Sequence, residues 1–314
     1  MRLLSYNIHK GIGGRDRRYR LDRIVQVIKA ENPDLICLQE VDRHVGRTRH
    51  DDQPKQLSEA LDATAHLYQL NVRLQSGGYG NLVLSRWPLR SSHQISLRRG
   101  RRKPRGAQLA VIESPEGPLH LVHWHLGLAE RERRWQVKHL LDHSLFHESA
   151  HLPTMIIGDF NDWLNTLARG PFAAHGFFQV TAPRSRFRSF PAYWPVVSLD
   201  KAFARGPIAI RHSRIVHSRI ARDASDHLPL VVDFHLRHLS SGASKYESRG
   251  FAELRAALIA KYRRVMRPRT ATTTTTAVYL GGSAAVSPVL NAVLATSIPK
   301  RLGRLPKMLG LKRQ

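Results

Sequence analysis

Residues 154–162, TMIIGDFND, give the strongest indication of the fold of this chain. Their apolar run is typical of a buried strand, and it ends abruptly at Gly158 and Asp159, where polar side chains begin. Residues 34–40, DLICLQE, repeat the pattern and end in Glu40. Loops at strand ends on a rigid sheet are where functional sites are built. The two stretches therefore predict a sheet protein with its chemistry at one edge.

Further strand-like and helix-like patterns extend outward from these stretches through residues 1–238. We expect strands at residues 2–7, 34–40, 81–85, 109–113, 119–123, 154–159, 197–203 and 228–234, and helices at 20–31 and 131–146. The alternation is imperfect, which favours an α/β protein with mixed sheets and helices outside them.

Residues 239–314 have a different composition and are predicted to be a basic, low-complexity C-terminal extension. Residues 240–244, SSGAS, read as a linker, and residues 249–269 form one basic helical pattern. Residues 240–314 hold 14 basic and 2 acidic residues. The simplest interpretation is a solvated extension. The alternative is a segment that binds RNA or holds the protein peripherally at an anionic membrane.

Composition limits the partners. The 314 residues carry a formal net charge of +26, which favours polyanions such as nucleic acid, anionic lipid or phosphorylated metabolites. No run of twenty strongly apolar residues is present, which argues against a polytopic membrane protein. The single cysteine excludes an internal disulfide and argues against a cysteine zinc site. No apolar segment of signal-peptide length follows Met1, so we expect a cytoplasmic location.

Polar and acidic residues follow the predicted strands at five places along the chain. If these tips meet, one pocket holds Asn7, Glu40, Asp159, Asn161, Asp200, Asp226 and His227. This set is rich in hard oxygen donors and has one imidazole but no thiol. It suits Mg²⁺, with Mn²⁺ as the alternative ion, rather than zinc.

The same tips carry a family resemblance. The segments YNIH (6–9), LQEV (38–41), GDFN (158–161), LD (199–200) and SDHLP (225–229) resemble, in order, the motifs of the endonuclease/exonuclease/phosphatase superfamily. The first and third also resemble a bacterial branch described as metal-dependent hydrolases. The resemblance implies a DNase I-like fold, which is a four-layer sandwich of two mixed β-sheets flanked by helices.

The resemblance also implies an activity, the hydrolysis of a phosphodiester or phosphomonoester by metal-assisted in-line attack of water. Glu40 matches the principal metal ligand, Asn7 lies beside it, and Asp226 is expected near the metal. A divalent ion lowers the cost of the charge that grows on the phosphate oxygens.

Five residues match catalytic positions of the superfamily. Asp159 matches the carboxylate that orients or deprotonates water, and Asn161 matches a phosphate contact. His227 matches the histidine that stabilises the transferring phosphoryl group, and Asp200 the carboxylate that holds it. His125 matches a second histidine found in many branches. Of the pair His123 and His125, only His125 is expected to reach the site.

Substrate contacts are predicted at Tyr79, Asn81 and Arg105, which resemble family positions near the phosphate. A turn with a packed tyrosine is the alternative interpretation of residues 79–81. The basic run 98–105 favours nucleic acid, whereas Tyr193, Trp194 and the basic extension favour a phospholipid. Both substrate classes remain open.

A second functional class is a non-catalytic module that binds polyanions or a membrane surface on the same fold. The intact set of seven polar tip residues argues against it, because a binding module does not need all of them. We expect a phosphate-ester substrate as the partner and no obligate protein partner.

Overall fold

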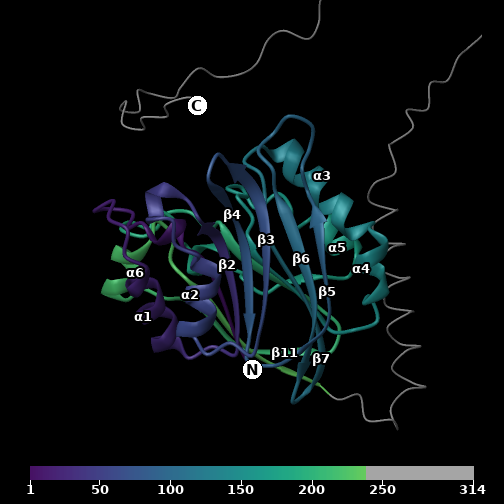
Figure 1. The fold of residues 1–314 in the computed structure, drawn as a ribbon. Coiled ribbons are helices and arrows are strands. Elements are labelled where there is room, and N and C mark those ends of the chain that lie inside the picture. Colours follow the sequence, from purple (N-terminus) through teal and green to yellow (C-terminus); the bar gives the residue numbers. More distant parts are fainter. Residues whose placement is uncertain (238–314) are drawn as a thin grey trace, which may run out of the picture. The chain divides into compact units, whose positions relative to one another are not determined.

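The structure is a computed structural model that describes residues 1–237. Its strands form two six-stranded sheets (Figure 1). The first sheet consists, in spatial order, of β11 (Ile208–Ile215), β12 (Leu230–Leu236), β1 (Arg2–Asn7), β2 (Leu35–Arg43), β4 (Gly77–Ser85) and β3 (Ala65–Leu74). The second consists of β5 (Leu89–Ser96), β6 (Gly106–Ser114), β7 (Gly117–His125), β8 (Thr154–Asp159), β10 (Asp200–Arg205) and β9 (Phe178–Gln179).

The helices connect these strands. They are α1 (Leu21–Glu31), α2 (Gln53–Ala60), α3 (Glu130–Leu141), α4 (Ser144–Glu148), α5 (Pro171–Ala174) and α6 (Arg219–Ala224), with short 3₁₀ segments η1 (His9–Gly11), η2 (Gly46–Thr48) and η3 (Arg184–Arg186). In Figure 1, α1, α2 and α6 lie beside the first sheet, and α3, α4 and α5 lie beside the second. None of the helices within residues 1–237 is long and apolar enough to cross a membrane.

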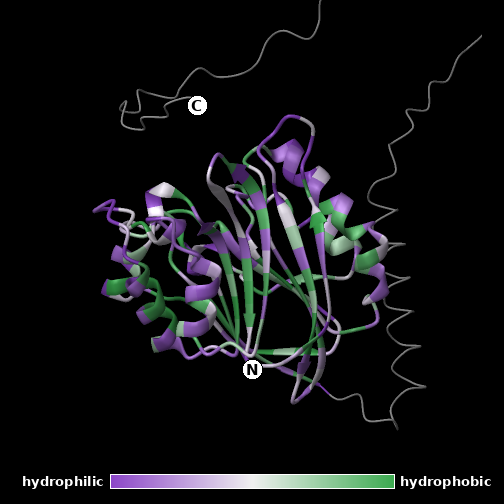
Figure 2. Cartoon of the chain, viewed as in Figure 1, coloured by the Kyte–Doolittle hydropathy of each residue, from purple (hydrophilic) through white to green (hydrophobic). Residues whose placement is uncertain are grey.

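Two hydrophobic clusters hold the layers together. The larger one joins the sheets, since Leu4 of β1 and Leu38 of β2 belong to the same buried cluster as Met155 and Ile157 of β8. The second cluster packs the outer face of the second sheet against its helices, with Trp124 of β7 among its members. Figure 2 shows hydrophobic residues along the strands and a mixture of both kinds on the helices. The predicted sandwich of two mixed sheets with helices outside is therefore confirmed.

Strand direction brings the polar tips to one edge. β1 runs parallel to β2, and β7 runs parallel to β8. In the second sheet His125 is paired in register with Asp159, and Asp159 is paired with Asp200 of the antiparallel strand β10. The carboxyl ends of β7 and β8 thus meet the first residue of β10.

Several predicted elements differ in their bounds. The helix expected at 131–146 is divided into α3 and α4, because His143 has extended backbone angles and its ring accepts the backbone N–H of Leu145. The strand expected at 197–203 begins only at Asp200, so this tip starts a strand instead of ending one. Asp226 and His227 follow the helix α6 rather than a strand. The predicted extension at residues 239–314, with its linker and helix, lies outside the described residues.

The strand expected at 34–40 does not stop at Glu40. β2 continues to Arg43, and its pairing with β4 becomes irregular between Leu38 and Val41. Glu40 lies within this irregularity at a φ of 59°, in the left-handed region that costs a non-glycine residue free energy. The bulge therefore gives the Glu40 side chain a different direction from the one that regular strand alternation would give it.

Candidate active site

Asp159 is the centre of the site. Its Oδ2 atom accepts a hydrogen bond of 3.1 Å from Nδ2 of Asn7, and it lies 3.4 Å from Nε2 of His125 and 3.8 Å from Nε2 of His227. Its Oδ1 atom accepts the backbone N–H of Asn161 at 2.9 Å. The carboxylate is only 1% exposed. Residues from four separate parts of the chain therefore converge on one buried carboxylate.

His227 lies between two carboxylates. Its Nδ1 is 2.9 Å from Oδ2 of Asp200, and its Nε2 faces Asp159. Burial alone would lower the pKa of His227, but the charges of Asp200 and Asp159 outweigh burial and raise this pKa to about 10. Burial raises the pKa of Asp159 above its ordinary value, and the neighbouring His227 opposes that shift. The imidazole is therefore positively charged at neutral pH.

His125 has the opposite electrostatic character. Burial and the nearby Arg105 hold its pKa well below the ordinary value, so this imidazole is neutral. His123 lies two residues earlier on the same face of β7 and deeper between the sheets. There its ring nitrogens contact Gln39 at 2.6 Å and Gln108 at 2.9 Å. Of the two histidines only His125 reaches Asp159, and the two differ in depth between the sheets rather than in the face of β7 that they occupy.

Asn161 is 6% exposed and is held by its backbone and its side chain. Its φ of 49° turns the chain directly after β8, and its Nδ2 donates to the carbonyl of Leu126 at 2.9 Å. This turn brings the Asn161 backbone N–H onto Asp159. We call Asn7, His125, Asp159, Asp200 and His227 the Asp159 cluster, and Asn161 is its support.

Glu40 is paired with the ammonium group of Lys10. Burial would raise the pKa of Glu40, but Lys10 lowers it well below its usual range. Lys10 belongs to η1 and has a φ of 63°, so the loop after β1 is bent to bring a cation to this carboxylate. The pair lies near the Asp159 cluster, since His125 also interacts electrostatically with Glu40.

Asp226 is close enough to His227 for its charge to help raise the pKa of that imidazole. Its Oδ2 atom lies 3.9 Å from Nε2 of His9, and its side chain is 31% exposed. The amide oxygen of Asn7 accepts the backbone N–H of His9 at 3.1 Å. Within residues 1–237 no group of three or more His, Cys, Asp or Glu side chains is close enough to hold a metal ion. Glu40 and Asp226 are therefore not members of such a group in the part of the chain that the structure describes.

Tyr79 is the centre of a second cluster, which is cationic. The cationic groups of Lys10, Arg47 and Lys103 lie 5.8, 5.3 and 5.2 Å from the centroid of its ring. Arg105 interacts electrostatically with Tyr79 and is 7% exposed, and its buried Nε has no hydrogen-bond partner. We call Lys10, Arg47, Tyr79, Lys103 and Arg105 the Tyr79 cluster.

Asn81 is not part of either cluster. It is 1% exposed, and its Nδ2 donates to the carbonyl of Gly106 at 3.2 Å, which links β4 of the first sheet to β6 of the second. This contact links the two sheets. The predicted contact between Asn81 and the substrate stays a prediction.

Sequence reasoning missed three cations of the Tyr79 cluster. Lys10 follows the YNIH motif directly, and Lys103 lies in the basic run 98–105, so both were close to residues already considered. Arg47 had no local signal, because its position follows from a bidentate ion pair with the buried Asp42. Only the fold brings the three side chains to one tyrosine ring.

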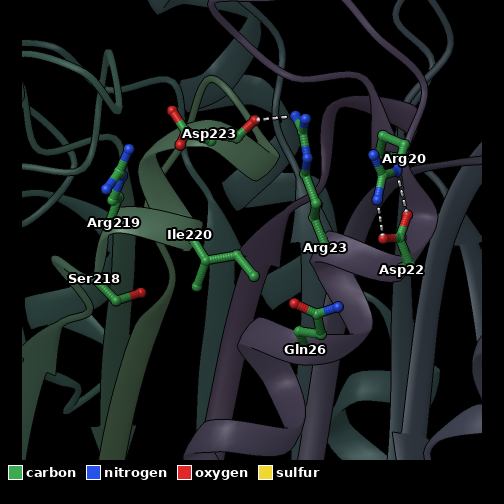
Figure 3. Close-up of a pocket in the computed structure, with 8 residues that line it drawn as sticks. All are labelled: Arg20, Asp22, Arg23, Gln26, Ser218, Arg219, Ile220 and Asp223. Carbon is green, nitrogen blue, oxygen red and sulfur yellow. Dashed lines mark hydrogen bonds and ion pairs between the residues drawn. The ribbon is translucent and has the colours of Figure 1, made fainter.

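A separate cavity of about 530 Å³ lies between α1 and α6 (Figure 3). It is lined by Arg20, Asp22, Arg23, Gln26, Ser218, Arg219, Ile220 and Asp223. Two of its cations are already paired, since Arg20 binds Asp22 and Arg23 donates to the carbonyl of Asp223 (Figure 3). It contains none of the predicted site residues and is not the candidate active site.

Known proteins resemble this chain in sequence. A sequence model described as "Endonuclease/Exonuclease/phosphatase family" matches residues 4–227. A protein of Escherichia coli described as "Uncharacterized protein YbhP" is 27% identical over 252 residues, which cover 75% of this chain and 96% of that protein.

Solved structures share the fold at low sequence identity. An endonuclease/exonuclease/phosphatase from Beutenbergia cavernae matches with a TM-score of 0.61 and 22% identity, covering 75% of this chain and 71% of that one. A mannosyl-6-phosphatase of Bacteroides thetaiotaomicron matches with a TM-score of 0.59 and 17% identity, covering 74% and 99%. TDP2 of Caenorhabditis elegans matches with a TM-score of 0.57 and 16% identity, covering 75% and 74%.

Proposed function

The chain belongs to the endonuclease/exonuclease/phosphatase family, and from that premise we propose that it is a divalent-metal-dependent phosphoesterase. Members of this family are hydrolases that act on phosphate esters. The proposed reaction is the hydrolysis of a phosphodiester or phosphomonoester by in-line attack of water. One observation carries the proposal, namely the buried Asp159 carboxylate with Asn7, His125 and His227 around a single oxygen atom.

Glu40 and Asn7 fit a hard divalent cation by their donor chemistry. Both present oxygen atoms, and Glu40 already pairs with a cation, the ammonium of Lys10. Mg²⁺ needs only one or two protein carboxylates, because it keeps several water ligands. We expect Mg²⁺, or Mn²⁺ in its place, to be held by Glu40 with Asn7 and Asp226 nearby. When bound, the ion offsets negative charge on the phosphate oxygens and the leaving oxygen.

Asp159 is the proposed acceptor of the proton from the attacking water. Its two oxygens are fixed by Asn7 Nδ2 and by the Asn161 backbone N–H, so the carboxylate needs no reorientation when water arrives. The positive charge on His227 favours the ionised form of Asp159, which is the form that a base requires.

His227 is the proposed donor to the phosphoryl group. Asp200 holds its Nδ1, which fixes the ring so that Nε2 points toward Asp159. A charged imidazole stabilises the oxygen whose negative charge grows in the transition state. Arg105, which is buried and has an unpartnered Nε, is proposed to contact the same phosphate.

The metal requirement is tested with bis-p-nitrophenyl phosphate as a small phosphodiester. The full chain should hydrolyse it with Mg²⁺ or Mn²⁺, lose the activity in EDTA, and recover it when the ion is restored. Asp142→Asn is the control for handling, because Asp142 is a surface carboxylate paired with Lys138 on α3. Equal rates in EDTA and in Mg²⁺ would exclude the proposed mechanism.

The substrate class is tested with a panel. Single- and double-stranded DNA, RNA, phospholipids and inositol phosphates are compared side by side with one divalent ion. Turnover of at least one class supports the phosphoesterase. Binding of polyanions without turnover of any class would instead support the non-catalytic module.

A further inference from the structure

Exposed apolar side chains gather at the edge that carries the Asp159 cluster. Eight large hydrophobic residues are exposed within residues 1–237, and only Leu74 and Phe178 lie away from the loops that follow β7 and β8 or precede β10. Five of the others form what we call the apolar rim: Trp163, Leu164, Tyr193, Trp194 and Val196. Leu128, 70% exposed, follows β7 on the other side of β8. Exposed apolar groups concentrated in this way mark an interaction surface.

The rim is connected to His227 through one intervening ring, that of Phe190. The ring of Trp163 lies 6.1 Å from that of Phe190, and Phe190 lies 4.9 Å from the ring of His227. The turn that carries Tyr193 and Trp194 is fixed by the backbone N–H of Ala192, which donates to the carbonyl of Asp226 at 2.7 Å. Whatever covers the rim therefore lies close to His227 and Asp226.

The segment that carries the rim contains only positive charges. Residues 163–199 contain four arginines and no acidic residue. Arg184, Arg186 and Arg188 are exposed, and Arg184 donates to the carbonyl of Trp163 at 3.1 Å. A surface that joins tryptophan, tyrosine and arginine is complementary to a partner with an anionic outer layer and an apolar interior.

The aliphatic members of the rim separate two classes of partner. Single-stranded nucleic acid binds to aromatic side chains by stacking, and Leu164 and Val196 cannot stack. Leu164 is the most exposed of the rim residues at 74%, and Val196 is 50% exposed. Insertion into the acyl boundary of a bilayer rewards aliphatic and aromatic side chains alike.

We propose that the apolar rim docks on an anionic phospholipid membrane, so that the phosphate of a lipid headgroup enters the site from the bilayer surface. The identity of the reaction after docking rests on the proposed function, whereas docking itself does not. The rim lies within residues 163–196, so its role is separate from that of the basic extension.

Docking is tested by co-sedimentation of the full chain with phosphatidylcholine vesicles that contain about 25% phosphatidylglycerol. EDTA is present throughout, so no hydrolysis is needed. We expect the double variant Trp163→Ser/Trp194→Ser to lose about tenfold or more in vesicle partitioning. Phe178→Ser is the matched control, because Phe178 is 46% exposed but lies on β9, paired with Ala204 below the tip residue Asp200. All three proteins keep the basic extension, so it contributes equally to each.

A second measurement reports on the rim itself. Acyl chains carrying bromine should quench the tryptophan fluorescence of the wild-type chain and quench it less in Trp163→Leu/Trp194→Leu, which remains apolar and still binds. Equal partitioning of the Ser double variant and the Phe178→Ser control would overturn the proposal. So would a larger loss of single-stranded DNA binding than of vesicle binding.

The two proposals fail separately. A chain that binds vesicles through the rim but hydrolyses no phosphate ester would refute the phosphoesterase and keep the docking surface. A chain that hydrolyses bis-p-nitrophenyl phosphate but shows no rim-dependent partitioning would do the reverse.

Discussion

The Asp159 cluster and the Tyr79 cluster lie at the same edge of the sandwich but compensate their charges differently. In the first, His227 lies between the carboxylates of Asp200 and Asp159. In the second, cations are crowded together, and burial with the neighbouring Arg105 lowers the pKa of Lys103. Glu40 lies between the two and interacts with groups of both.

This difference in charge compensation suggests that one cluster serves the chemical step and the other serves substrate binding. A charged imidazole between buried carboxylates is fully compensated in the free protein, so it is ready to stabilise charge without rearrangement. In the Tyr79 cluster Lys10 and Arg47 already pair with Glu40 and Asp42, and the further positive charge of Lys103 and Arg105 favours binding of a phosphate group. The Asp159 cluster should therefore control the rate of the chemical step, and the Tyr79 cluster should control affinity.

The largest effect is expected from the Asp159 cluster. Asp159→Asn keeps the shape of the side chain but removes the base, and His227→Ala removes the charged donor. Each should lower kcat by about a thousandfold or more, measured with bis-p-nitrophenyl phosphate in Mg²⁺. The Asp142→Asn control should keep the wild-type rate. Turnover within about tenfold of wild type in either variant would contradict the roles assigned here.

The next effect concerns Glu40. Glu40→Gln keeps an oxygen donor but removes its charge, so the Mn²⁺ concentration for half-saturation should rise at least about tenfold. Titration calorimetry without substrate measures this directly. Glu113→Gln is the control, because Glu113 pairs with Arg90 at the opposite end of β6 from Arg105. Unchanged Mn²⁺ affinity in Glu40→Gln would place the ion elsewhere.

A smaller effect is expected from the Tyr79 cluster. Lys103→Ala removes one cation near Tyr79, so KM for an anionic substrate should rise by about threefold to tenfold while kcat changes little. Arg101→Ala, which is exposed in the same loop and absent from the cluster, is the control. A fall in kcat with unchanged KM would assign Lys103 to the chemical step and break the division of tasks.

The smallest effect is one of stability and concerns His123. Burial lowers the pKa of His123 to about 3, whereas an unfolded histidine binds a proton near pH 6.5. Between these values only the unfolded chain is protonated, so His123 makes the protein less stable as pH falls through this window.

Replacing His123 by Gln should flatten that decline by up to about 1.4 kcal/mol per pH unit. Urea unfolding of both proteins between about pH 7 and about pH 5 measures the difference. Parallel profiles would show that His123 does not titrate as its burial indicates.

The site residues that directly follow a short apolar run could be predicted from the sequence. Residues 154–159 form β8 as expected, because the run is buried on both faces and Asp159 ends it. Asn7 ends β1 in the same way. These tips meet because neighbouring strands end at one edge of the sheet. The position of each strand end can be inferred from the periodicity of the sequence.

Features set by tertiary contacts could not be predicted. The bulge at Glu40 depends on pairing with β4, and the edge strand β3 (Ala65–Leu74) is only half-buried, so its pattern is weak. Arg47 reaches Tyr79 because Asp42 holds it. The exposure of Trp163 and Trp194 could not be predicted, because the local sequence around an exposed aromatic residue does not differ from that around a buried one.

The protonation states of three buried histidines, His123, His125 and His227, are the sharpest test of the charge arrangement described here. Nuclear magnetic resonance of ¹⁵N-labelled full chain at about pH 8 reads the protonation of each imidazole. We expect a doubly protonated His227 beside neutral His123 and His125, and loss of the His227 charge in Asp200→Asn. A neutral His227 in the wild-type chain would contradict this expectation.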